Sequence, residues 1–198
     1  MIDKPKDDPG RKQLGFAEAV VREFEFVEAS YGFRRIEESI TFVRYESDQI
    51  FLNVYHGRSS YEIGVELGKL VADPSVNRYG LSYVIAGLAP EYEGQTSFQA
   101  TEPKTIAKCV AKAARIVESY CGPALAGDRE AFQKIEEAAR VEGERLLVRY
   151  KYGAIINRAD HAWENKDRVR AAELYEEAEP GLDTTRKRRL DYIRRKIR

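Results

Sequence analysis

Residues 50–67 of the 198-residue chain read IFLNVYHGRSSYEIGVEL, and this stretch decides the fold class that we expect. Apolar residues occupy every second position on both sides of a turn: Ile50, Leu52 and Val54 before it, and Ile63, Val65 and Leu67 after it. A period of two is typical of a β-strand with one buried face. Because a short turn joins the two runs, they predict an antiparallel pair.

The flanking sequence extends this pair into a small layered structure. Residues 36–45 are rich in β-branched and aromatic residues and predict another strand. Residues 11–31 carry apolar side chains at helical spacing: Phe16, Val20, Phe24, Val27 and Tyr31. Gly32 then ends the predicted helix. A sheet must bury its apolar face, so we expect this helix to pack on an antiparallel sheet of three to four strands.

From residue 101 onward the apolar spacing is helical, which predicts a C-terminal helical bundle and an α+β fold overall. We therefore expect a flexible tail at residues 1–10, a sheet domain at 11–100 and a helical subdomain at 101–198. The helical subdomain ends in a basic helix.

The composition excludes some classes of protein. Hydrophobic residues make up 43% and charged residues 33% of a chain with zero formal net charge, so no global field attracts nucleic acid or membrane. No apolar run is long enough to span a bilayer, and the N-terminus lacks the apolar stretch of a secretory signal. We expect a cytoplasmic protein without a membrane partner. Cys109 and Cys121 would be roughly 18 Å apart on one helix, too far for a disulfide, so buried free thiols are expected.

The second set of alternating side chains in the hairpin is the candidate partner-binding surface. Its members face away from the apolar set: Phe51, Asn53, Tyr55, Glu62 and Glu66. The strand at 36–45 adds either Arg44 or Tyr45, and the turn adds His56 and Arg58. Mixed aromatic and charged residues are typical of protein-recognition surfaces. The alternative is that the later helices cover this face.

No motif in the chain predicts catalysis. Ser59 near His56 lacks the Gly-x-Ser-x-Gly frame of a nucleophile elbow, and no second histidine or cysteine stands close enough to suggest a metal site. We expect no catalytic residue, no metal and no cofactor. An enzyme with an unrecognised site remains an alternative, and it would need a pocket where His56, Arg58 and Glu62 converge.

The C-terminus has the strongest charge asymmetry. After Pro180 there are eight basic and two acidic residues, a net charge of +6, which leaves −6 for the first 180 residues. The candidate nucleic-acid contacts are the basic residues Arg186, Lys187, Arg188, Arg189, Arg194 and Arg195. Leu190, Ile193 and Ile197 at helical spacing indicate one packed side. Docking on an acidic surface of the same chain, or on another acidic partner, therefore stays open.

Two segments resemble known families. Ala162-Trp163, Asp167, Val169, Ala171-Ala172 and Tyr175 resemble a single tetratricopeptide-like hairpin. Such repeats need about three units to bury a continuous core, and we find one, so an ordinary helical hairpin is the alternative.

The second resemblance covers about 50 residues of the helix and sheet region. Tyr31-Gly32-Phe33, residues 43–47 (VRYES) and residues 54–65 (VYHGRSSYEIGV) resemble uncharacterised bacterial proteins of the polymorphic-toxin immunity type. That resemblance implies a non-enzymatic protein that binds and blocks a toxin. The acidic first 180 residues suit a basic target. We therefore expect a non-enzymatic binding protein, with nucleic-acid binding through the C-terminal helix as the alternative.

Overall fold

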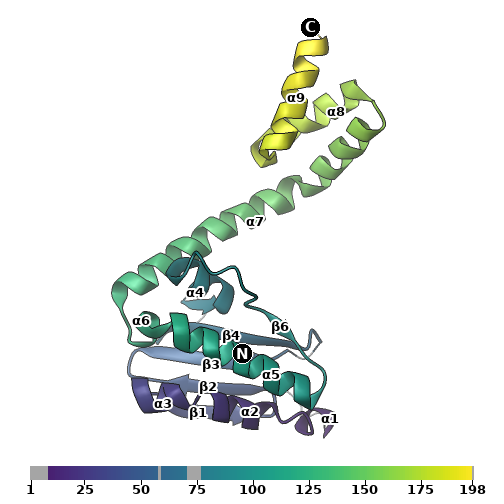
Figure 1. The fold of residues 1–198 in the computed structure, drawn as a ribbon. Coiled ribbons are helices and arrows are strands. Elements are labelled where there is room, and N and C mark those ends of the chain that lie inside the picture. Colours follow the sequence, from purple (N-terminus) through teal and green to yellow (C-terminus); the bar gives the residue numbers. More distant parts are fainter. Residues whose placement is uncertain (1–8, 58, 71–76, 198) are drawn as a thin grey trace. The chain divides into compact units, whose positions relative to one another are not determined.

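The computed structural model describes residues 9–57, 59–70 and 77–197, and Figure 1 shows their elements. The chain divides into two compact units, residues 1–139 and residues 140–198. The sequence placed the boundary near residue 100. The observed boundary lies later because α5 (Pro103–Tyr120), α6 (Gly122–Leu125) and the first turns of α7 (Arg129–Glu164) contribute to the core of the sheet unit.

The sheet of the first unit is antiparallel, as expected. Its described strands are β1 (Arg34–Ser39), β2 (Phe42–Glu46), β3 (Ile50–His56), β4 (Glu62–Lys69), β5 (Arg78–Gly80) and β6 (Phe98–Gln99). They lie in the order β1-β2-β3-β4-β5, and β6 also pairs with β4. Figure 1 labels β1 to β4 and β6. The sheet has more strands than predicted for two reasons. Residues 36–45, predicted as one strand, contain the turn at residues 40–41 that separates β1 from β2. In addition, β5 and β6, with three and two residues, are too short to show a period.

The N-terminal helical region is broken where the sequence predicted one helix. It consists of α1 (Pro9–Lys12), α2 (Phe16–Glu23) and α3 (Glu25–Tyr31). Gly15 has a left-handed conformation, with φ of 64°, and separates α1 from α2. Of the expected flexible tail, residues 1–8 lie outside the described part of the chain, and the tail's last two residues begin α1.

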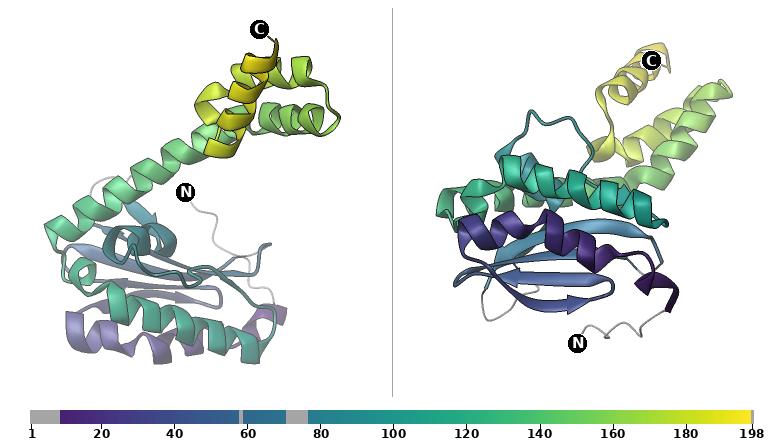
Figure 2. Two further views of the ribbon diagram at one scale, coloured as in Figure 1. Left: turned by 45° about the horizontal axis from the view of Figure 1, so that its top comes forward. Right: turned by 60° about the horizontal axis from the view of Figure 1, so that its bottom comes forward.

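The core of the first unit lies between one face of the sheet and the helices. Figure 2 shows α2 and α5 side by side on this face, and α4 (Leu81–Leu88) joins the same core. The sheet contributes inward side chains such as Tyr45, Leu52 and Val54. Cys109 and Cys121 are both free thiols, but only Cys121 is buried as expected, whereas Cys109 is half-buried. Burial raises the pKa of Cys121 to about 12.

The second unit is helical, which agrees with the predicted C-terminal helical region. It contains the later part of α7, then α8 (Arg168–Glu177), a 3-10 turn (Glu179–Gly181) and α9 (Thr184–Ile197). The side chain of Asp167 caps α8 by accepting a hydrogen bond from the backbone N–H of Arg170 at 3.0 Å. The helical unit has a small core of its own, which is rich in alanine and is completed by Leu174, Tyr175 and residues of α9.

Candidate binding surface on the outer face of the sheet

The outer face of the sheet carries the side chains that the sequence assigned to it. Val43, Tyr45, Leu52 and Val54 point into the core, so alternation places Phe51, Asn53, Tyr55, Glu62 and Glu66 on the other side. Arg44, rather than Tyr45, completes this face because Arg44 pairs with Asn53 across β2 and β3. We call these six residues, together with Phe42, Glu46 and Arg78, the outer face.

A row of polar groups crosses the outer face from β2 to β5. The guanidinium of Arg44 donates from Nη1 to Asn53 Oδ1 at 3.2 Å, and Asn53 Nδ2 donates to Glu66 Oε2 at 3.4 Å. On the far side, Arg78 Nη1 lies 3.8 Å from the same Glu66 oxygen. Each group in the row therefore contacts the next, so the side chains form one connected polar network.

Aromatic rings flank this row on both sides. Phe51 pairs with Gly68 and Tyr55 with Gly64, and each ring fills the space where a glycine Cβ would stand. The guanidinium of Arg44 lies 4.4 Å from the centre of the Phe51 ring. Burial, together with the carboxylates of Glu66 and Glu62, raises the pKa of Tyr55.

The outer face differs from the inner face in what contacts it. The hydrogen bonds, ion pairs and ring contacts of its side chains run to other strands or to Ser97, which donates to Glu62 at 2.9 Å; none joins a described helix. Within the described residues, helices thus cover only the inner face. Phe51 and Asn53 are nonetheless only 1% and 5% exposed. The accessible part consists of Tyr55 and the surrounding charged groups.

His56, assigned by sequence to the binding surface, lies in the interior instead and is 2% exposed. It stacks on Phe16 with ring centres 5.7 Å apart, and its Nε2 donates to the carbonyl oxygen of Ala100 at 2.9 Å. Burial lowers the pKa of His56, and the charge of Arg11, which donates to the His56 carbonyl, lowers it further. His56 therefore does not lie on the outer face.

The sequence also named Arg58 and Glu62 as residues that could converge with His56 on one pocket. Arg58 lies outside the described residues. Glu62 points to the outer face while His56 points inward, so these two side chains do not converge on one pocket. The described residues also contain no group of three or more His, Cys, Asp or Glu side chains that could hold a metal ion.

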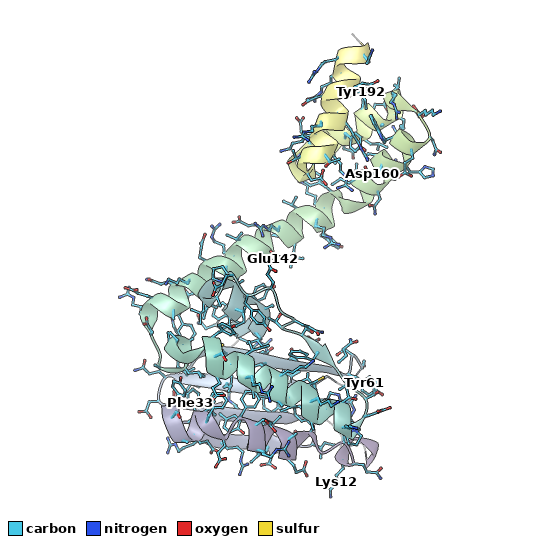
Figure 3. The ribbon with its side chains drawn as sticks, in the orientation of Figure 1. Lys12, Phe33, Tyr61, Glu142, Asp160 and Tyr192 are labelled. Atoms are coloured by element: carbon cyan, nitrogen blue, oxygen red, sulfur yellow. The ribbon has the colours of Figure 1, made fainter. Side chains whose placement is uncertain are left out.

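The basic C-terminal helix is partly docked within its own unit. Arg186 and Arg189 donate to the carboxylate of Asp160 on α7, at 2.7 Å and 3.0 Å, and Arg194 donates to Glu176 at 3.1 Å. Asp160 is labelled in Figure 3 on the part of α7 that faces α9. Three of the six nucleic-acid candidates thus have acidic partners of the same chain, while Lys187, Arg188 and Arg195 are exposed.

Asp160 is the centre of this docking. It also accepts a hydrogen bond from the hydroxyl of Tyr175 at 2.7 Å. Burial alone would raise the pKa of Asp160, but the hydrogen bonds from Arg186 and Tyr175 and the charges of Arg186 and Arg189 lower it. Arg189 also lies over the ring of Trp163, 5.3 Å from its centre. We call Asp160, Tyr175, Arg186 and Arg189 the charged cluster of the helical unit.

A cationic row on α5 was missed in the sequence. Lys104, Lys108, Lys112 and Arg115 are exposed and follow one another at steps of four, four and three residues. That spacing places them on one face of the helix, so the signal was present in the sequence. It was overlooked because the residues before Pro180 are acidic in sum.

No family model, curated protein or solved structure matches the chain. Among the described helices, none combines the length and apolar character needed to cross a membrane.

Proposed function

We propose that the chain is a non-enzymatic binding protein that contacts a partner protein through the outer face of its sheet. The observation that carries this proposal is the polar row from Arg44 through Asn53 and Glu66 to Arg78, flanked by aromatic rings on a face that no described helix covers.

Preorganisation favours this role. Arg44, Asn53 and Glu66 already hold one another, so binding would cost little side-chain entropy. Tyrosine and arginine are also the residue types that dominate binding energy in protein interfaces, and both are present here in Tyr55, Arg44 and Arg78.

Charge points to the class of partner. The sheet unit contains 22 acidic and 17 basic residues, a net charge of −5. An acidic body attracts a basic partner and raises its association rate. Together with the resemblance of residues 31–65 to immunity-type proteins, this charge supports a basic toxin as the partner, which the chain would block by binding.

Site-specific crosslinking tests this proposal. A photo-crosslinking amino acid in place of Glu62 reports on the outer face, and the same amino acid in place of Glu18, exposed on α2, is the matched control. In cells of the native host we expect one stoichiometric protein adduct from position 62 and none from position 18. The same adduct from both positions, or from position 18 alone, would contradict the assignment to the outer face.

The captured partner then allows a functional test. If it is a toxin, its expression alone should arrest growth, and co-expression of the wild-type chain should restore it. Glu62→Lys should weaken the rescue, whereas Glu18→Lys should leave it unchanged. A captured partner that is harmless when expressed alone would contradict the immunity role while leaving the binding surface in place.

Nucleic-acid binding by the helical unit is the second candidate. This unit contains 16 basic and 11 acidic residues, a net charge of +5, and exposes Lys187, Arg188 and Arg195. Neutralising these three residues to Gln should weaken binding to single-stranded RNA and reduce its salt dependence. An equal loss from Lys104→Gln and Lys108→Gln would assign the contact to α5 instead, and no binding by the wild-type chain at low salt would end this candidate.

A further inference from the structure

β1 is an edge strand of the sheet, and its exposed residues carry charges in a regular arrangement. It pairs with β2 on one side and with no described strand on the other. Residues 34–38 are all exposed, and Ile36 in the middle is 55% exposed, although it is a large apolar side chain. An edge strand presents unpaired backbone N–H and C=O groups that can pair with a further strand.

Along β1, positive charges lie on one side of Ile36 and negative charges on the other. The sequence from residue 34 to residue 38 is Arg-Arg-Ile-Glu-Glu, with both cations before the isoleucine and both anions after it. When two such strands run antiparallel, the basic half of each lies beside the acidic half of the other, and the two isoleucines lie near the centre. When they run parallel, like charges oppose one another.

We propose that two copies of the chain pair through β1 in antiparallel orientation, forming a two-fold symmetric dimer with one continuous sheet. Opposite charges across neighbouring strands are stabilising and like charges are destabilising. A two-fold interface must be complementary to itself, and this strand meets that requirement in its charges. The dimer would also cover the side chain of Ile36, whose exposure to water is unfavourable in the single chain.

The irregularity of β1 agrees with a selective edge. Its pairing with β2 shifts register between Arg35 and Glu37, which leaves Ile36 as the extra residue of a bulge. Bulges and charges at an edge disfavour pairing with an arbitrary strand. Here the same charges disfavour other strands and favour a second copy, which is how polar groups confer specificity on an interface.

The dimer would also affect the proposed binding surface. Residues that oppose each other in an antiparallel pair point to the same side of the sheet. The outer faces of both copies would therefore lie on one side of the continuous sheet. The dimer itself does not depend on whether the outer face binds a protein.

Charge-reversal variants of the full chain test the proposal, with oligomeric state measured by sedimentation equilibrium. The wild-type chain should dimerise. Arg34→Glu with Arg35→Glu, and separately Glu37→Arg with Glu38→Arg, should each weaken dimerisation by roughly 100-fold, because like charges then face each other. Mixing the two double variants should restore a dimer that contains one copy of each.

The matched control reverses two exposed acidic residues on the helical side, Glu18→Arg with Glu25→Arg, and should dimerise as the wild type does. Circular dichroism establishes that each variant is folded, and Ile36→Lys provides a further variant that should be monomeric without charge reversal. A wild-type chain that stays monomeric at millimolar concentration would overturn the proposal. A dimer that survives both double reversals, or a mixture that forms no mixed dimer, would do the same.

Discussion

The sheet unit and the helical unit are stabilised by different interactions. The core of the sheet unit is built from aromatic and branched side chains, such as Phe24, Tyr45 and Leu52, packed between the sheet and the helices. The core of the helical unit is small and rich in alanine, and the charged cluster around Asp160 joins its helices. Charged residues thus lie mainly on the surface of the first unit but contribute to the structure of the second.

The single tryptophan makes this comparison measurable. Trp163 belongs to the helical unit, where its ring contacts Arg168 and Tyr192. Tryptophan fluorescence therefore reports the unfolding of the helical unit, while far-ultraviolet circular dichroism reports both units.

The largest effect should come from the core of the sheet unit. Phe24 is fully buried, and Phe24→Ala should lower the free energy of unfolding of this unit by about 3–5 kcal/mol, since it removes the ring and leaves a cavity. Urea unfolding followed by circular dichroism measures the change. The fluorescence transition of Trp163 should keep its midpoint; a parallel shift would show that the two units unfold as one.

The next effect should come from the charged cluster. Asp160→Asn removes the charge that holds Arg186 and Arg189 and should destabilise the helical unit by about 2 kcal/mol. Trp163 fluorescence during urea unfolding reports it. Asp191→Asn, at an exposed site on α9, is the control and should change the free energy by less than about 0.5 kcal/mol. Equal effects would mean that net charge, rather than the cluster, stabilises this unit.

A smaller, pH-dependent effect should separate the units further. The pKa of His56 is lowered in the folded state, so folding favours the neutral ring. This stabilisation is complete above the unfolded pKa of about 6.5 and is lost as the pH falls below it, with a slope of at most about 1.4 kcal/mol per pH unit. Urea unfolding by circular dichroism between pH 7.5 and 5.5 measures the slope. His56→Gln should flatten it, and an unchanged slope would exclude His56 as its origin.

The smallest effect should come from an exposed ion pair. Arg170 and Glu173 lie 2.7 Å apart on α8, with both side chains about half exposed. Arg170→Ala should change the stability of the helical unit by no more than about 0.5 kcal/mol, because solvent screens such pairs. A loss as large as that of Asp160→Asn, measured by the same fluorescence, would contradict the special role of the charged cluster.

Much of the sheet unit could be predicted from the sequence, because alternating apolar residues predict both where a strand lies and which face of the sheet each side chain occupies. The alternation in residues 50–67 placed Asn53 and Glu66 on the same face, where the structure shows them. The same alternation predicts that His56, two residues after Val54, points inward, and the structure shows it buried. The proximity of His56 to the turn outweighed that signal.

The helical unit was harder to predict because its decisive contacts are distant in the sequence. Arg186 and Arg189 precede Leu190 and Ile193 by four residues each, so helical spacing placed them on the packed side of α9. Their partner Asp160 is 26 residues away from Arg186, and no local pattern identifies it.

The aromatic rings over glycine on the outer face have a consequence for sequence variation. Because Tyr55 occupies the space beside Gly64, and Phe51 that beside Gly68, neither position of a pair can change freely on its own. A side chain at position 64 would displace the ring, and a small residue at position 55 would expose the backbone beneath it. In related chains, positions 55 and 64 should therefore change together. Position 68 should stay glycine even when position 51 changes, because a Cβ there would also lie 2.0 Å from the backbone oxygen of Asn77.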